Sequence, residues 1–195
     1  MQSARTLEPG DHEVAGTILV QGAAPDGGVI PVPSAFLDVR WATVSGLDLG
    51  LRYEFQTPIS VMARVRLYDT GGSFALAFAP RFGVYAPGLA WPTGVELYLP
   101  VLLSFFFDGG LEITATAQSL VGAYKRWPSS GFVPTSGLGG SLGVRIPVGR
   151  HRLVLELTTL APLGQGFPTW SGGDIIVEQQ SQRALVQVGV GFSVN

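Results

Sequence analysis

The segment that decides the fold runs from Leu47 to Gln56 and reads LDLGLRYEFQ. Apolar side chains occupy the odd positions through Phe55, and Asp, Gly, Arg, Glu and Gln occupy the even ones. Such alternation is typical of a β-strand with two different faces, because successive side chains of a strand point to opposite sides. The segment from Val186 to Val194 repeats the pattern. Both segments therefore predict two-faced strands and exclude amphipathic helices.

The same alternation recurs along the chain, in segments bounded by turn residues. Most of these segments have 8 to 13 residues, close to the roughly 9 to 11 that a tilted strand needs to cross a bilayer. We therefore predict an all-β fold of about ten strands, with eight as the alternative. The predicted strands are 13–21, 35–43, 47–56, 61–68, 74–85, 95–107, 111–123, 138–147, 152–161 and 184–195.

The connections between these strands alternate in length. Short, glycine-containing connections are typical of tight hairpins, and longer connections rich in proline and glycine lie between them. This predicts a closed, antiparallel, up-and-down barrel with both chain ends at the short-turn end. Pro80 and Pro100 fall inside predicted strands, so each implies a bulge or a shifted boundary. The short connections are 44–46, 69–73, 108–110 and 148–150; the long ones are 22–34, 86–94, 124–137 and 162–182, and 57–60 is short where a long one is due.

The composition of the two faces decides which of them lines the lumen. The polar face holds acids and arginines in near balance, separated by small residues, and the chain has a single lysine, Lys125. A water-exposed surface would be rich in lysine and glutamate, whereas a crowded interior suits guanidinium–carboxylate pairs. We therefore expect a lumen charge network of Asp38, Arg40, Asp48, Arg52, Glu54, Arg64, Arg66, Arg81, Glu96, Glu112, Arg145 and Glu156. The same face also carries Glu13, Arg152 and Arg183.

The apolar face is expected to contact lipid, as in membrane barrels and opposite to soluble ligand-binding barrels, which are the alternative for the fold. The expected lipid-facing residues are Leu47, Leu49, Leu51, Val186, Val188, Val190 and Phe192. Aromatic residues near strand ends predict an interfacial girdle. Its expected members are Trp41, Tyr53, Tyr85, Trp91, Tyr124 and Trp127, while Phe36, Met62, Tyr68, Tyr98 and Phe106 are expected to point inward and narrow the lumen.

With these features the chain resembles the bacterial outer-membrane β-barrel class. The resemblance rests on the even strand count, the alternating connections and a last strand whose apolar face includes Phe192. It implies an outer-membrane location, with lipid or detergent as the partner. We expect one domain without a cofactor, monomeric, in which residues 1–11 form a periplasmic segment and 12–195 form the barrel. The first ten residues are similar to the start of a mature exported protein, with no signal peptide.

The composition also excludes several classes of function. A net charge of −2 offers no basic surface for nucleic acid, and the absence of cysteine removes disulfide scaffolds, zinc ribbons and thiol catalysis. His12 and His151 lie near strand ends without metal-ligand spacing, and no G-x-S-x-G motif is present. We therefore expect no catalytic residue, no metal site and no enzyme activity.

The sequence favours two functions, and an outer-membrane enzyme is the third alternative. The first is a narrow pore for small polar solutes or water, in which Arg52 pairs with Asp48 or Glu54. The second is a plugged barrel that acts in surface recognition or anchoring through its long outer connections. The longest of them, 162–182, holds Trp170, and its later part predicts an extension of a barrel strand around Ile175.

Overall fold

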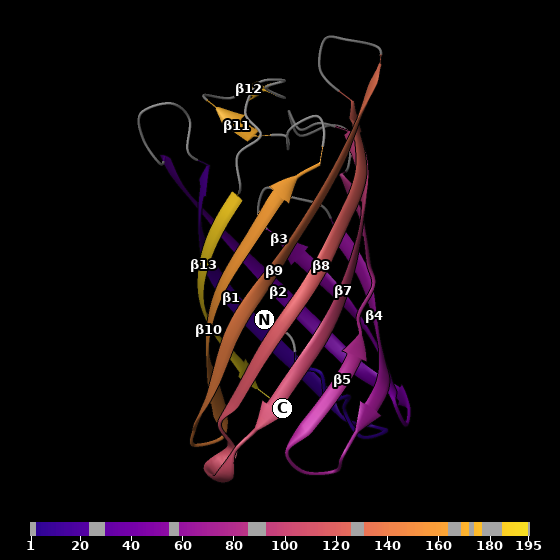
Figure 1. Ribbon diagram of the computed structural model, residues 1–195, viewed down its shortest axis with the longest axis vertical. Helices are drawn as coiled ribbons and strands as arrows, with labels where there is room; N and C mark the ends of the chain where they lie inside the picture. Colours follow the sequence, from indigo (N-terminus) through magenta and orange to yellow (C-terminus); the bar gives the residue numbers. More distant parts are fainter. Residues whose placement is uncertain are drawn as a thin grey trace.

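The computed structural model is a barrel of antiparallel β-strands (Figure 1). It describes residues 3–23, 30–54, 59–85, 93–125, 131–163, 169–171, 174–176 and 185–194. The wall consists of β1 (His12–Ala23), β2 (Ile30–Val44), β3 (Leu47–Glu54), β4 (Ile59–Asp69), β5 (Phe74–Phe78), β6 (Arg81–Tyr85), β7 (Thr93–Phe106), β8 (Glu112–Lys125), β9 (Phe132–Val148), β10 (His151–Pro162) and β13 (Leu185–Val194). The remaining elements are the 3₁₀ turn η1 (Asp108–Gly110) and the short strands β11 (Thr169–Ser171) and β12 (Asp174–Ile176).

The wall strands pair with their neighbours in chain order, which makes the barrel an up-and-down one. The first and last wall strands, β1 and β13, pair antiparallel with Val14 opposite Val194, and this pairing closes the wall. Strands β5 and β6 share one position, because both pair with β4 on one side and β7 on the other. The described strands therefore form ten positions, and the predicted closed, antiparallel barrel of about ten strands is confirmed.

The strand position that β5 and β6 share is interrupted at Ala79 and Pro80. Pro80 and Pro100, the two prolines that we expected to disturb a strand, both lie at this interruption. The Pro80 carbonyl accepts a hydrogen bond from the Ala63 N–H (3.0 Å), and the Pro100 carbonyl accepts one from the Ala79 N–H (2.9 Å). The N–H and C=O groups of one strand residue point to the same neighbouring strand, so the donor that Pro100 lacks would also face Ala79. Both missing donors thus fall at one interruption, and β7 continues unbroken through Pro100.

The short connections lie together at one end of the barrel, the lower end in Figure 1, where both β1 begins and β13 ends. Gly46 (φ 84°) joins β2 to β3, and Gly149 (φ 62°) joins β9 to β10. Both residues adopt the left-handed region that tight hairpins require and that a Cβ disfavours. No helix in the described part of the chain has the length and apolar character to cross a membrane.

At the other end the strands extend further than the sequence predicts. β2 begins at Ile30, β8 ends at Lys125 and β9 begins at Phe132, so parts of the expected connections 22–34 and 124–137 are strand. Proline and glycine in these stretches are typical of loops, but continued pairing between adjacent strands satisfies their backbone groups. The segment around Ile175 does not extend a barrel strand; it pairs with Trp170 in a separate two-stranded sheet, β11–β12.

Candidate functional site

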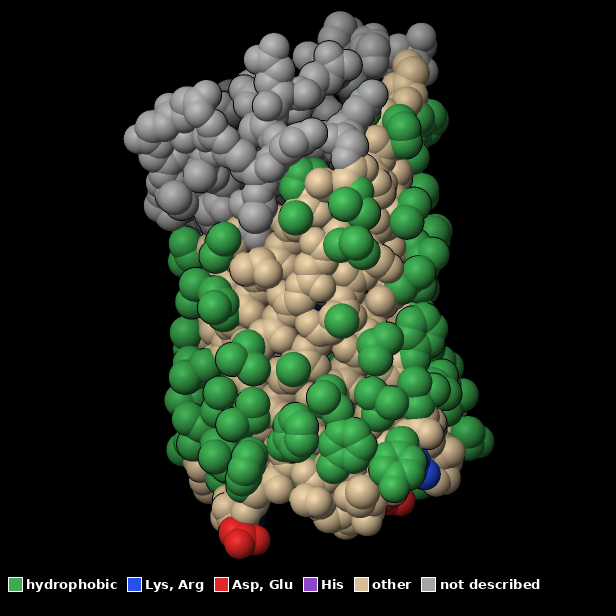
Figure 2. Space-filling view, in the orientation of Figure 1, with side chains coloured by type: hydrophobic (Ala, Val, Ile, Leu, Met, Phe, Trp, Pro, Cys, Tyr) green, Lys and Arg blue, Asp and Glu red, His purple; other side chains and the backbone are tan. Residues whose placement is uncertain are grey.

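The wall has an apolar outside and a polar inside. On β13, Val186, Val188, Val190 and Phe192 are 42 to 56% exposed, while the alternating Ser193 is buried. Leu49 and Leu51 of β3 are exposed in the same way, and Leu47, next to the turn, is half-buried. Figure 2 shows hydrophobic side chains over the described part of the face in view, with charged side chains visible only at its lower rim.

The members of the predicted charge network that have described side chains lie in the lumen. Asp38, Arg40, Asp48, Arg64, Glu96, Glu112 and Arg145 are buried, and Arg52, Arg66, Arg81 and Glu156 are half-buried. The Glu54 side chain lies outside the described residues. Glu13, which we assigned to the polar face but not to the network, is buried and is one of its central members.

Three ion pairs join residues that stand directly opposite each other on adjacent strands. Glu13 of β1 faces Arg40 of β2 and accepts a hydrogen bond from its guanidinium. Asp48 of β3 faces Arg64 of β4, whose Nε lies 2.9 Å from Oδ2. The third pair joins Asp38 of β2 and Arg52 of β3, which also stand directly opposite each other. They form a bidentate contact of 2.6 and 2.7 Å.

The third pair corrects our expectation that Arg52 holds Asp48; the other expected partner, Glu54, has a side chain outside the described residues. Residues four apart on one strand are separated by about 13 Å, since each residue rises about 3.3 Å. Residues directly opposite on neighbouring strands have Cβ atoms only about 5 Å apart. Arg52 therefore pairs across to Asp38, and Asp48 pairs across to Arg64 instead. The register of β2, β3 and β4, which the sequence does not specify, decides the partners.

Longer contacts link these pairs along one side of the lumen. Arg145 of β9 lies 3.3 Å from the second carboxylate oxygen of Glu13, although β10 and β13 stand between their strands. Arg40 lies 3.8 Å from Asp48. The nearest inner-face residues of β13, Gly191 and Ser193, are small and leave room over that strand for the Arg145 side chain. We call the connected residues Glu13, Arg40, Asp48, Arg64 and Arg145 the ion network.

A hydroxyl–carboxylate cluster lies beside the ion network at the same end, on β7 and β8. Ser104 of β7 and Thr114 of β8 are fully buried, with their hydroxyl oxygens 2.6 Å apart. Both donate to Glu112 Oε1, at 2.9 and 3.0 Å. Glu112 Oε2 is 3.5 Å from the Arg152 guanidinium. The cluster therefore supplies hydroxyl groups to a buried carboxylate that stands directly opposite Arg145 of the ion network.

The space beside Ser104 is filled by the start of the chain, which the sequence did not predict. Ser3, Ala4 and Thr6 are buried, so part of the segment that we expected on the periplasmic side lies inside the barrel. Ala4 belongs to one buried cluster with Ala75 and Ala77 of β5, Ala79 at the interruption after β5, and Leu102 of β7. We call Ala75, Ala77 and Ala79 the alanine seat and residues 3–8 the N-terminal segment.

Polar contacts fix the N-terminal segment in the seat. The Ala4 N–H donates to Ser104 Oγ (2.8 Å), and the Leu7 N–H donates to Asp48 Oδ1 (3.0 Å). The Arg64 guanidinium donates to the Ser3 carbonyl. All three wall residues in these contacts, Ser104, Asp48 and Arg64, are far from the segment in sequence, so the contacts are tertiary. The wall therefore recognises the backbone of this segment.

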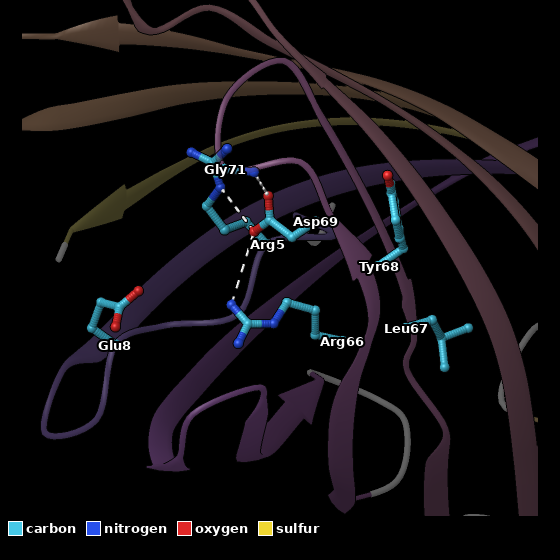
Figure 3. A pocket seen from close by; sticks show the side chains of 7 residues that line it. All are labelled: Arg5, Glu8, Arg66, Leu67, Tyr68, Asp69 and Gly71. Atoms are coloured by element: carbon cyan, nitrogen blue, oxygen red, sulfur yellow. Dashed lines mark hydrogen bonds and ion pairs between the residues drawn. The ribbon is translucent and has the colours of Figure 1, made fainter.

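Arg5, the residue after Ala4, lines a cavity at the short-turn rim (Figure 3). Its guanidinium donates to the Gly72 carbonyl (3.0 Å), lies 3.6 Å from Asp69 and stacks 3.9 Å from the Phe106 ring centre. The cavity has a volume of about 660 Å³. Its lining consists of Arg5, Glu8, Arg66, Leu67, Tyr68, Asp69 and Gly71.

The upper part of the lumen holds a further polar group. Arg81 of β6 lies 3.8 Å from Glu96 and stacks 4.0 Å from the Tyr98 ring centre. Tyr124 is buried and donates to Glu96 (3.0 Å). This corrects the expected girdle position of Tyr124: it has the same strand parity as Glu112 on β8 and therefore faces the lumen. Thr135 of β9 is buried nearby, across from Gly122.

The remaining aromatic residues divide between the two faces. Trp41 and Tyr53 are exposed on the outside, whereas Tyr85, Trp91 and Trp127 have no described side chains. Phe36 and Met62 are buried inside, as expected of residues that narrow the lumen. Tyr68 is not: it is 56% exposed and packs on Phe74. A bulge between Arg66 and Tyr68 adds a residue to β4 and reverses the face on which Tyr68 lies.

Candidate residues for catalysis and metal binding are not brought together. His12 and His151 are both exposed at strand ends. Among the described residues, no three His, Asp or Glu side chains are grouped as metal ligands. The buried hydroxyl of Ser104 contacts the Glu112 carboxylate and the Thr114 hydroxyl, and both histidines lie at the surface.

Comparisons with known proteins identify similar folds and no family. No family model matches the chain, and no curated protein matches it. Among solved structures, it is similar to Neisserial surface protein A (NspA), with 11% identity, 94% of this chain and 96% of that chain covered, and a TM-score of 0.47. It is also similar to Ail, the attachment invasion locus protein of Yersinia pestis (8%, 95% and 98%, 0.42), and to the translocator domain of the autotransporter NalP from Neisseria meningitidis (12%, 94% and 88%, 0.46).

Proposed function

We propose that this protein is an integral β-barrel of a bacterial outer membrane whose lumen is closed, and that it acts in recognition or anchoring through the connections at its long-loop end. The observation that carries the proposal is the division between its two faces. Exposed Leu, Val, Ile and Phe side chains surround the wall, and ionised side chains are buried within it. A water-soluble barrel would expose a large apolar surface at a high cost, whereas lipid accepts it.

The contents of the lumen favour a closed barrel over a permanently open pore. The ion network fills one side of the short-turn end and the N-terminal segment fills the other. Small residues, hydroxyl groups and paired charges occupy the space that solutes would need. A scaffold of this kind supports binding at its loops. The closed wall leaves no unpaired edge between its described strands, which supports a monomer.

A narrow pore for small polar solutes is the second candidate. It is favoured by the charged and hydroxyl side chains that line the lumen at several heights, from Glu112 at the short-turn end to Glu96 further along. It requires that some part of the filling move. We propose no catalytic role, because the two histidines are exposed and lie apart from the polar side chains of the lumen. We propose no nucleic-acid partner, because the net charge is −2.

The proposal is tested with two adjacent residues of β4, since the chain contains no cysteine. Val61 is exposed on the outside and Met62 is buried in the lumen. Val61→Cys and Met62→Cys variants carry the same small fluorophore and are refolded into vesicles that contain brominated lipid. The proposal predicts strong quenching at position 61 and weak quenching at position 62. Equal quenching, or recovery of the unlabelled protein as a monomer in buffer without detergent, would contradict it.

A further inference from the structure

The alanine seat and the groups around it have the form of a ligand site. Ala75 and Ala77 are fully buried, yet their side chains are the smallest that a wall strand can present apart from glycine. They leave the space that Ala4 and its backbone occupy. Elsewhere at this height the lumen is filled by long side chains that belong to the wall, such as Arg40 and Arg145. On this side the filling comes from a segment outside the barrel sheet.

The wall groups that bind the segment also have partners within the wall. Ser104, which accepts from Ala4, also contacts Thr114 and Glu112. Asp48, which accepts from Leu7, also pairs with Arg64. When the segment leaves, Ser104 keeps Thr114 and Glu112, and Asp48 keeps Arg64 at Oδ2, so each residue retains a partner in the wall. Asp48 Oδ1 and one Arg64 nitrogen lose the contacts to Leu7 and Ser3 and become available to another peptide backbone. Because leaving such buried groups unsatisfied is costly, the vacated site favours a replacement ligand.

The segment itself has few contacts that would hold it permanently. It forms no ladder with a wall strand. Ala4 is its one apolar residue in the buried cluster, and Arg5 remains 39% exposed at its side chain. Glu8, Pro9 and Gly10 are exposed where the chain continues toward β1. Segments with little buried apolar area and few tertiary contacts open most readily.

We propose that the short-turn end of the lumen is a binding site for an extended peptide, occupied here by the N-terminal segment of the same chain, which can leave and be replaced by a free peptide of like chemistry. The site reads the backbone through Ser104, Asp48 and Arg64, requires a small residue at the seat, and takes an arginine side chain between Asp69, the Gly72 carbonyl and the Phe106 ring. Residues 3–5, Ser-Ala-Arg, meet these requirements.

The test uses a variant that lacks residues 3–8, purified in detergent, and a synthetic peptide of residues 3–9, SARTLEP, with a fluorophore at its C-terminal end. Fluorescence anisotropy measures binding. The variant is expected to bind the peptide saturably, and the full chain at least tenfold more weakly, because its tethered segment competes at a high effective concentration. No saturable binding to the folded variant would overturn the proposal.

Two substitutions define specificity in this experiment. Arg5→Glu in the peptide places a carboxylate beside Asp69 and is expected to weaken binding at least tenfold. Ala77→Leu in the barrel fills the seat and is expected to abolish binding. Ala15→Leu is the matched control, since Ala15 is another buried, inward-facing alanine but lies on β1 beside the ion network. Equal loss in Ala77→Leu and Ala15→Leu would contradict a site at the seat.

A second measurement on the full chain covers the case in which the shortened variant does not fold. Ser3→Cys and Ser193→Cys place single thiols at two buried serines, one in the segment and one on β13 beside the ion network. A water-soluble maleimide is expected to label position 3 at least tenfold faster than position 193. Equally slow labelling would show a permanent plug and overturn the proposal. Both experiments work in detergent, so their failure is separate from that of the membrane proposal.

Discussion

The two sides of the lumen at the short-turn end are filled by different means. Along β9, β10, β13 and β1 to β4, the filling is the ion network, whose long side chains pair across strands. Its members Asp48 and Arg64 also contact the N-terminal segment. Along β5, β7 and β8, the wall presents Ala75, Ala77 and Ser104, and a separate segment fills the space. The first filling is part of the wall and cannot leave without unfolding. The second pairs with no wall strand, and the contacts of the wall strands with one another remain when it leaves.

The largest effect is expected from Glu13→Gln in the ion network. Glu13 pairs with both Arg40 and Arg145, so its loss removes the carboxylate that two buried guanidinium groups share and leaves Arg40 with the longer contact to Asp48 (3.8 Å). Breaking a buried pair in this way costs about 3 to 5 kcal/mol. Urea titration of the refolded protein measures the change, with the exposed Glu8→Gln as control. A loss below about 1 kcal/mol would mean that the ion network is no more essential to the stability of the barrel than the N-terminal segment.

The outer surface is common to both sides, and Leu51→Arg tests it. Leu51 is 46% exposed on β3, and an arginine facing lipid near the midplane costs about 2 to 4 kcal/mol. We expect this loss of folding free energy in vesicles, with little change for Leu51→Ala. Equal stability of the two variants would mean that Leu51 does not face lipid.

A smaller effect separates the two sides directly. Ala15→Leu, beside the ion network, adds volume to a filling that cannot move, and overpacking of this kind costs about 1 to 3 kcal/mol. Ala77→Leu adds the same volume at the alanine seat, where the N-terminal segment can withdraw, so we expect a loss under about 1 kcal/mol. Both residues are buried alanines that face the lumen. Equal losses in urea titrations would remove the distinction between the sides.

The smallest effect is expected from Arg5→Ala. The Arg5 side chain is partly exposed, and its contact with Asp69 is 3.6 Å. A screened pair and a partly exposed cation–π contact together contribute about 1 kcal/mol or less. The global stability should therefore change little, whereas labelling of Ser3→Cys should accelerate because the segment is released more often. Unchanged labelling would mean that Arg5 does not hold the segment.

Much of the wall could be predicted from the sequence, because alternation is a local property. The pattern of Leu47 to Gln56 determines which side chains share a face, and glycine marks the hairpins. The partners of Arg52 could not be predicted in the same way, because the register between strands decides them. We predicted that Tyr68 points inward, but a bulge in β4 shifts the alternation and places it outside. No residue type in the sequence marks the position of this bulge.

The N-terminal segment was missed for a different reason. Its residues carry no periodic pattern, and its position depends on the space that a wall strand leaves free. The signal was present on that strand rather than in the segment itself. Ala75 and Ala77 of β5 and Ala79 just after it are three small residues at alternate positions, too small to fill a lumen by themselves. A packed interior has few voids, so such a stripe calls for a filling from elsewhere in the chain.

The central claim is that one side of the lumen is closed by the wall and the other by a segment that can leave. Single-channel recording in planar bilayers, at two salt concentrations, tests it on the full chain and on the variant lacking residues 3–8. We predict that the full chain inserts and gives at most brief openings, whereas the shortened variant gives sustained steps whose size scales with salt. Steps of equal size and duration in both proteins, or none in an inserted shortened variant, would contradict the account.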